Sequence, residues 1–385
     1  MKNPRVAVAH CGSYEIDTVE AAVRRSVDQL GGIAQFVRSG QRVLVKPNLL
    51  RPSPPEHAVV THPAVVRAVV RLAQAAGAKV VVADNPSVPL LSQRAWQQAY
   101  EVMGLAEVAA ETGAQLNTRI APLQSPHPHG LLVKQVDVSG FLAEADVVIN
   151  LPKLKTHGMM CFTGAVKNLF GVVPGLTKAG YHAKLQTVER FADMLLDLAA
   201  YVRPALSIMD AITGMDGDGP GAGDPFPIGA ILAAPDPVAL DVAALALVGH
   251  DPGSVPTVAA AVRRGWSTGR VQDLDLVGDA FDGLRVDGFR MPKGGARSVP
   301  RGVPAFLGRL GTRVMVARPY VTMRCIGCKQ CIEGCPVHTI DLVQGRAHIE
   351  LGNCIRCYCC HEICPVKAIE LRRPLVARAL ARVGL

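Results

Sequence analysis

The sequence has few aromatic residues and no segment suited to anchoring it in a membrane. Phe, Trp and Tyr make up 4% of the 385 residues, which argues against the stacking surfaces that bind single-stranded nucleic acids. No apolar run reaches the roughly 20 residues that a membrane-spanning helix needs. The N-terminal segment has no basic stretch followed by an apolar one, so we expect no secretory signal and a cytoplasmic protein.

Cysteine, in contrast, is abundant, and eight of the 11 cysteines form two runs of identical spacing. The runs are Cys325-x2-Cys328-x2-Cys331-x3-Cys335-Pro336 and Cys354-x2-Cys357-x2-Cys360-x3-Cys364-Pro365. In bacterial iron–sulfur sites with this spacing, three close thiolates bind one [4Fe–4S] cluster and the fourth reaches the other cluster. The predicted ligands are Cys325, Cys328, Cys331 and Cys364 for the first cluster, and Cys354, Cys357, Cys360 and Cys335 for the second.

The two cysteine runs are also an internal repeat. CIGCKQCIEGCPVHTI (325–340) aligns with CIRCYCCHEICPVKAI (354–369), and a strand-like segment follows each helix-forming unit. This region resembles the bacterial two-cluster ferredoxin family. Zinc sites use four ligands, usually in paired Cys-x2-Cys units, and disulfides are not expected in a protein without signs of secretion. Cys359 lies between the expected ligands, and we interpret it as a packing residue.

Positive charge is concentrated towards the C-terminus. The net charge is +9, and residues from 291 onward hold 15 Lys and Arg but only 5 Asp and Glu. A cubane bound by four thiolates carries a charge of about −2, so two clusters would offset part of this excess. A basic tail is also typical of nucleic-acid-binding proteins, but no helix-turn-helix, zinc-finger or aromatic strand motif accompanies it.

The first 290 or so residues alternate apolar strands with helices. Strands expected at 42–46 and 79–83 flank a helix expected at 64–76, which forms a βαβ unit and implies a parallel sheet. Further strands are expected at 145–149, 205–209 and 229–233. The predicted fold class is therefore α/β, with a mostly parallel sheet and flanking helices, followed by a small ferredoxin-like α+β domain that binds two [4Fe–4S] clusters.

Composition divides the chain into four parts. We expect the α/β domain at 1–292, a connector rich in Pro, Gly and Arg at 293–318, the ferredoxin domain at 319–373 and a basic C-terminal helix at 374–385.

Polar residues follow the expected strands where these end, which is where ligands bind in open parallel sheets. The segment 153–184 holds five lysines and two histidines but no Asp or Glu, which favours binding of a phosphate, a carboxylate or an enolate-like intermediate, although a merely basic loop is the alternative. The glycine-rich segment 214–224 could hold a divalent metal, balance the lysines or form a plain turn. The candidate substrate- or cofactor-binding residues are Lys46, Asn48, Lys153, Lys167, Asn168, Asp210 and Asp216.

Three residues are candidates for catalysis. His62 is expected at a helix N-terminus and His157 among lysines, and both settings favour the neutral imidazole, which can accept a proton. Lys155 in the lysine-rich segment is the third candidate.

Six segments resemble a prokaryotic family known as domain of unknown function 362, which is often joined to a two-cluster ferredoxin unit. They are VLVKPNL (43–49), THPAVV (61–66), INLPKLKTHG (149–158), TGAVKNLFG (163–171), MDGDGPGAG (215–223) and DPVALD (236–241). The resemblance implies the same domain arrangement and site residues but supplies no reaction.

These features predict an iron–sulfur oxidoreductase that passes low-potential electrons from two clusters to an anionic substrate or cofactor in the α/β domain. The alternative is an electron carrier or maturation factor that docks on a redox partner protein. Nucleic-acid binding is a third, less favoured hypothesis. The sequence leaves open whether a flavin or a further divalent metal is also bound.

Overall fold

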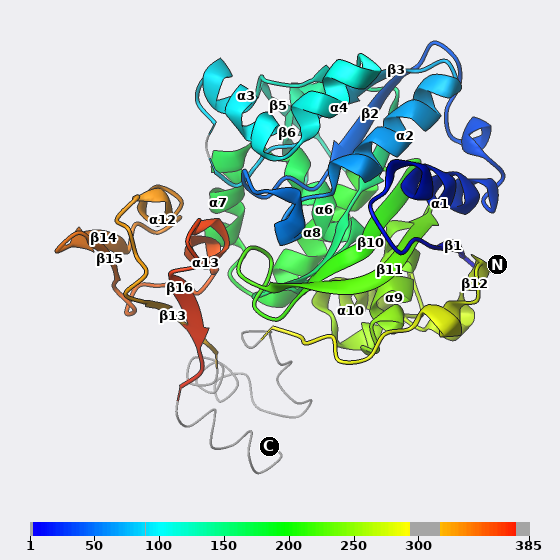
Figure 1. Cartoon of the computed structure of the whole chain (residues 1–385). Coiled ribbons are helices and arrows are strands. Elements are labelled where there is room, and N and C mark those ends of the chain that lie inside the picture. Colours follow the sequence, from blue (N-terminus) through cyan, green and yellow to red (C-terminus); the bar gives the residue numbers. More distant parts are fainter. Residues whose placement is uncertain (1–2, 89, 293–315, 375–385) are drawn as a thin grey trace.

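The computed structural model describes residues 3–88, 90–292 and 316–374, which form an α/β domain and a smaller domain beside it (Figure 1). In this part of the chain the α/β domain has a ten-stranded sheet in the order β12-β1-β11-β10-β7-β2-β3-β4, with β8 paired to β10 and β9 to β8. The strands are β1 (Arg5–His10), β2 (Arg42–Pro47), β3 (Lys79–Val82), β4 (Gln115–Leu116), β7 (Val147–Leu151), β8 (Lys153–His157), β9 (Cys161–Thr163), β10 (Leu206–Asp216), β11 (Asp224–Ala234) and β12 (Asp275–Gly278).

The helices of this domain connect and cover the strands. They are α1 (Ile16–Asp28), α2 (Pro63–Ala75), α3 (Gln93–Val102), α4 (Leu105–Thr112), α5 (Gly140–Ala143), α6 (Ala165–Asn168), α7 (Gly175–Lys184), α8 (Val188–Val202), α9 (Pro237–Leu247) and α10 (Pro256–Arg263). A separate hairpin pairs β5 (Pro122–Pro126) with β6 (Gln135–Ser139). Among the described residues, no helix has both the length and the apolar character needed to cross a membrane.

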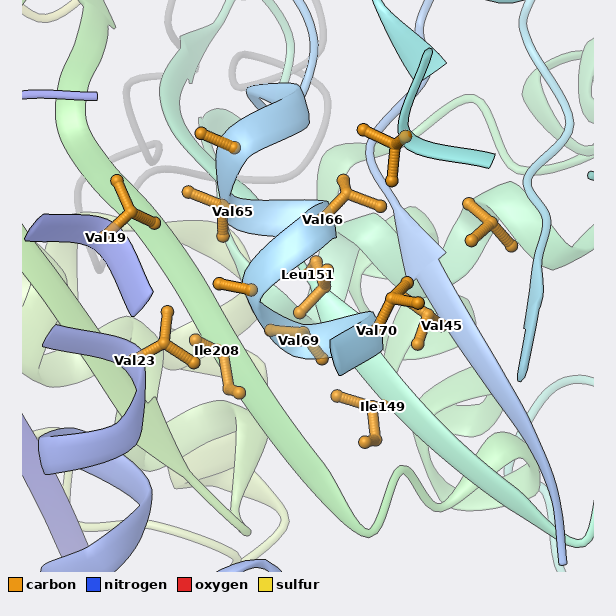
Figure 2. Close-up of a cluster of buried hydrophobic side chains, with 14 of the residues drawn as sticks. Val19, Val23, Val45, Val65, Val66, Val69, Val70, Ile149, Leu151 and Ile208 are labelled. Carbon is orange, nitrogen blue, oxygen red and sulfur yellow. The ribbon is translucent and has the colours of Figure 1, made fainter. Parts of the chain in front are cut away.

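Helices cover both faces of the sheet, so its central strands are buried on both sides. In β2, Val43 and Val45 pack into the core beneath α1 and α2, whereas Leu44 between them packs into the opposite core with α8. Figure 2 shows the first of these cores, in which Val65 and Val69 of α2 lie against the sheet. A continuous apolar run is therefore the pattern expected for such a strand.

Helix α2 shows how local sequence positions the site. The ring of His62 caps the helix by accepting a hydrogen bond at Nδ1 from the backbone N–H of Ala64 (3.2 Å), and Pro63 occupies the first turn. Gly77 follows the helix with φ +82°, a conformation that favours glycine. These caps fix the start of α2 beside the ends of the central strands.

The predicted α/β class with a mostly parallel sheet is confirmed, but two strand boundaries were wrong. Strand β10 continues past Asp210 to Asp216 and forms an antiparallel hairpin with β11. Residues 153–157, expected to form a loop, are strand β8, which pairs with the extended half of β10. Strand pairing satisfies the backbone N–H and C=O groups of these segments whatever their side chains are. Their polar composition therefore did not indicate strands.

The smaller domain repeats one unit twice, as predicted. It contains β13 (Arg318–Val321), α12 (Gln330–Glu333), β14 (Ile340–Val343), β15 (Arg346–Ile349), α13 (Cys359–Ile363) and β16 (Ile369–Arg372). Strand β13 pairs with β16 and β14 with β15, both antiparallel. The predicted connector and C-terminal helix fall almost entirely on 293–315 and 375–385, outside the described residues.

Backbone conformation repeats as well. Lys329 and Tyr358, which follow equivalent cysteines, both have positive φ (63° and 64°) and precede the short helices α12 and α13. His338 and Lys367 form a second equivalent pair with φ of 51° and 50°. Non-glycine residues rarely adopt this conformation outside functional loops, so the duplicated strain is in keeping with loops shaped around a bound group.

Candidate functional site

The eight cysteines predicted to bind clusters gather into two groups. Cys325, Cys328, Cys331 and Cys364 line one small cavity. In the second group, the Cys354 thiol has Cys357 and Cys335 as its electrostatic neighbours. The Cys360 thiol lies near Cys357, Cys354 and Cys335, and also near Cys331 of the first group. These are the two crossed sets expected from the spacing, so the fourth cysteine of each run lies with the other run.

The surroundings of the thiols fit iron–sulfur ligation. The backbone N–H of Thr339 donates to Sγ of Cys335 (3.5 Å), and that of Ala368 donates to Sγ of Cys364 (3.2 Å) at the equivalent position of the second repeat. Hydrogen bonds to sulfur are one of the means by which proteins tune such clusters. Burial, together with the nearby thiols, raises the pKa of Cys331 to about 11, a cost that binding to iron as thiolates would remove.

The ferredoxin domain packs on the glycine-rich hairpin turn between β10 and β11. Nε2 of His361 lies 3.0 Å from the carbonyl oxygen of Asp218, and Nζ of Lys367 donates to the carbonyl of Gly223 (2.9 Å). A Cβ atom at Gly221 would lie only 2.6 Å from the backbone oxygen of Glu362. Gly221 therefore allows this turn to approach the backbone of α13 closely, and the neighbouring Pro220 lines the cleft between the domains.

Gly221→Ala is accordingly expected to loosen the interface between the domains, because backbone atoms must separate to admit the methyl group. Amide hydrogen exchange of α13 should accelerate severalfold. Gly180→Ala is the matched control, since a Cβ at that helical position meets nothing within 4 Å. Equal exchange in the two variants would contradict the tight contact.

A buried contact between a histidine and a carboxylate also joins the two domains. Nε2 of His157, on β8, lies 3.1 Å from Oε1 of Glu362, on α13, and both side chains are buried. Because Nδ1 of His157 accepts hydrogen bonds from the backbone N–H groups of Met159 and Met160, Nε2 carries the proton and lies close to the carboxylate. The ring of His157 is thus held between its own loop and Glu362.

The pKa values of this pair agree with a neutral imidazole beside an ionised carboxylate. Burial, with a contribution from Lys167, lowers the pKa of His157 to about 4. Burial alone would raise the pKa of Glu362, but His157 and Lys167 lower it to about 2. His157 therefore holds the two domains together, and its predicted role as a free catalytic base is not supported by its contacts.

Between the two domains lies a cleft that encloses about 1070 Å³ of unfilled space, part of it open to solvent. Residues of α7 line it on one side and residues of α12 and α13 on the other, and Figure 1 shows where these helices lie in the fold. The α/β domain contributes Asn48, Lys155, Lys167, Asn168, Lys178 and His182, and the ferredoxin domain contributes Gln330, Glu333, Cys359 and Glu362. The structure thus brings four predicted site residues, Asn48, Lys155, Lys167 and Asn168, next to α13, which carries Cys360.

The cleft is less cationic than the segment 153–184 suggests, because distant parts of the chain supply carboxylates. Asp84 forms an ion pair with the buried Lys46 (2.8 Å) beneath the cleft. Nζ of Lys178 donates to the carbonyl oxygen of Asn85, and Nζ of Lys155 donates to that of Val59 (2.6 Å).

Lys167 differs from the other lysines of the cleft. Its ammonium group has no hydrogen-bond or ion-pair partner within the described ranges and lies 6.0 Å from the centre of the Phe170 ring. Burial lowers the pKa of Lys167, and the charges of Glu362 and Cys359 oppose this shift. This half-buried cation is available to an anion.

A second group of predicted residues lies apart from the cleft lining. Lys153 and Asp210 form a fully buried ion pair (2.7 Å), and the hydroxyl of Tyr14 donates to Asp210 (2.9 Å) and accepts from Lys153 (2.8 Å). The ring of His62 stacks on that of Tyr14, with centroids 3.6 Å apart. Burial lowers the pKa of His62 to about 4. These predicted residues therefore lie outside the lining of the cleft.

Asp216 is also engaged elsewhere. Its carboxylate accepts two hydrogen bonds from the guanidinium of Arg290 (2.6 and 2.7 Å). In the described part of the chain, no group of three or more His, Cys, Asp or Glu residues could hold a single metal ion. The carboxylates of the hairpin turn thus anchor the segment that follows β12.

Sequence reasoning missed Glu362, Glu333 and Tyr14. The alternation of apolar and polar residues carries no information on which distant carboxylate faces a given cation. The one available signal was position, since Glu362 lies between two expected cluster ligands, Cys360 and Cys364.

Comparisons with known proteins agree with this architecture. Residues 43–246 match the domain of unknown function DUF362, and residues 320–365 match the 4Fe-4S dicluster domain. The chain is 38% identical over 265 residues to "Thylakoid-associated protein sll1697" of Synechocystis sp. (strain ATCC 27184 / PCC 6803 / Kazusa), which spans 68% of this chain and 79% of that protein.

Two solved structures show a weaker likeness. The lactate racemase apoprotein from Thermoanaerobacterium thermosaccharolyticum is 12% identical with a TM-score of 0.37, covering 61% of this chain and 55% of that one. A Thermotoga maritima protein is 12% identical with a TM-score of 0.32, covering 54% and 52%. The chain thus spans about half the length of these structures. From the sequence matches, the chain belongs to the DUF362 family and is an iron–sulfur protein with a ferredoxin-type 4Fe-4S domain.

Proposed function

We propose that this protein is an oxidoreductase whose interdomain cleft binds an anionic substrate or cofactor beside the second cysteine group. One observation carries the proposal: a single cleft is lined both by Lys155 and Lys167 and by α13, the helix that holds Cys360. The eight grouped cysteines would hold two [4Fe–4S] clusters, which supply single electrons when bound. An external low-potential reductant would provide those electrons.

The residues of the cleft have separate roles in this proposal. The free ammonium group of Lys167 would bind the anion by a charge-assisted hydrogen bond. Lys155 is the sole one of the three predicted catalytic residues that lines the cleft. Burial, helped by the charge of Lys167, lowers its pKa well below the usual value, so Nζ would release a proton readily to a group being reduced.

Lys167→Met is expected to weaken anion binding about tenfold to a hundredfold, because it removes a hydrogen bond to a charged group. The probe is 4-hydroxybenzoate, a carboxylate whose ring suits the apolar part of the lining, and its affinity is measured by isothermal titration calorimetry. Lys184→Met is the control, because Lys184 is an exposed lysine at the end of α7. Equal affinity in the two variants would refute the role of Lys167.

A second candidate function, an electron carrier that docks on a partner protein, is favoured by the exposed side of the first cysteine group. Cys328 is exposed there, and the neighbouring Met323 and Ile326 are 81% and 65% exposed. The same titration separates the two functions. A carrier without a substrate site would bind no carboxylate in either variant.

A further inference from the structure

The cleft contains a chain of asparagine side chains whose orientation is fixed from within the protein. Nδ2 of Asn150 donates to the carbonyl oxygen of Ala165 (3.1 Å), which can only accept. Oδ1 of Asn150 therefore accepts from Nδ2 of Asn168 (2.8 Å), and Oδ1 of Asn168 accepts from Nδ2 of Asn48 (3.0 Å). Each amide is thus oriented by the one before it.

The last member of the chain is left with an unused acceptor. Asn48 lines the cleft, and its Oδ1 is buried without a hydrogen-bond partner in the described structure. A rotation of the amide that presented Nδ2 to the cleft would place two oxygens against each other at Asn168. The network therefore fixes Oδ1, and not Nδ2, as the atom of Asn48 that is left without a partner.

Asn85 repeats this arrangement on the same lining. Its Nδ2 donates to the carbonyl oxygen of Gly171 (2.9 Å) and to the hydroxyl of Ser139 (2.8 Å). Oδ1 of Asn85 is buried and has no partner among the residues that the structure describes, although the side chain is 1% exposed. Thr163, His182 and Glu362 of the same lining also have a buried polar atom without a hydrogen-bond partner in the described structure. Buried polar atoms are rarely left unsatisfied, and an amide oxygen can only accept, so the two asparagines indicate a partner that donates.

We infer that the ligand of the cleft is an anion that also carries hydrogen-bond donors, such as a hydroxy- or amino-substituted carboxylate. Its anionic group would bind the ammonium of Lys167, and its O–H or N–H would donate to Oδ1 of Asn48 or Asn85. An anion without a donor would leave these oxygens unpaired and would bind more weakly. This inference rests on the proposed function, since it specifies the ligand class of the same cleft.

The test compares two ligands of similar size that differ in one donor, 4-hydroxybenzoate and 4-methoxybenzoate, on the full chain by isothermal titration calorimetry. The 3-hydroxy and 3-methoxy isomers extend the test to a second donor position. We expect at least one hydroxy compound to bind about fivefold to a hundredfold more tightly than its methoxy partner, the range for leaving one buried acceptor unpaired. Asn48→Leu should reduce that ratio. Asn117→Leu, a change at a similarly half-buried asparagine beside β4, should leave it unchanged.

The outcomes separate this inference from the proposed function. Equal affinities for every hydroxy and methoxy pair would overturn the donor requirement while leaving an anion-binding cleft intact. No binding of any of the four compounds would overturn the anion site and the inference with it. The wild-type comparison needs no substitution, so a variant that fails to fold does not decide the result.

Discussion

Replacing Lys153 with methionine is expected to lower the free energy of unfolding of the α/β domain by about 3–5 kcal/mol. Lys153 and Asp210 are both fully buried, and their charged atoms lie 2.7 Å apart. Burial lowers the pKa of Lys153, and Asp210 counteracts that shift, so each charge depends on the other. Methionine has a similar length but leaves the Asp210 carboxylate in the core without a counter-ion.

Urea unfolding followed by tryptophan fluorescence measures this change, because Trp96 is buried in the same domain. Arg5→Met is the matched control. Arg5 and Asp275 are also paired at 2.8 Å, but their side chains are 54% and 42% exposed, so the loss should be about 0–1 kcal/mol. Similar losses in both variants would mean that the buried pair contributes no more than a surface pair.

Features that depend on residues close together in the chain could be predicted from the sequence. The cysteine spacing identified both thiol groups because iron–sulfur loops are local and their ligands lie three or four residues apart. The apolar run at 42–46 identified a buried strand because burial on both faces requires continuous hydrophobicity. These predictions depend only on neighbours in the chain.

Lysine roles could not be predicted in that way. Lys46 and Lys153 lie at or just after expected strand ends, and Lys167 lies in the same lysine-rich segment as Lys153. Two of them are neutralised by buried carboxylates, whereas Lys167 is free. A charged side chain can be buried only with a partner, and the partners come from distant strands. Sequence position therefore selects the candidate cations, but tertiary pairing decides which of them remains for a ligand.

The position of the cleft also depends on contacts between residues that are distant in the sequence. The glycine-rich segment after β10, for which a metal site, balance of the lysines or a plain turn were all open, is a hairpin turn that contacts α13 through Gly221. His157, a candidate proton acceptor, lies against Glu362 at the same interface. Residues that resemble catalytic groups in the sequence thus assemble the site by holding the two domains together.

Cys335→Ala is expected to remove about half of the iron and to do so from the cluster of the other cysteine run. Cys335 follows Cys331 in the sequence, but it is absent from the lining of the first cavity and is an electrostatic neighbour of Cys354, as Cys357 is. Loss of one ligand from a buried four-thiolate site leaves one iron without its protein ligand. Iron analysis and electron paramagnetic resonance of the reduced, anaerobically prepared protein measure what remains.

The crossed arrangement also predicts which pairs of variants should give the same residual spectrum. Cys335→Ala and Cys357→Ala should leave the same residual signal, and Cys364→Ala should match Cys328→Ala instead. Cys359→Ala is the control and should retain the full iron content, because Cys359 is additional to both groups of four. If Cys335→Ala matched Cys328→Ala, each run would bind its own cluster. The cleft would then adjoin a site whose four ligands all come from 354–364, and the contact of Cys335 with the second group would have no role in binding.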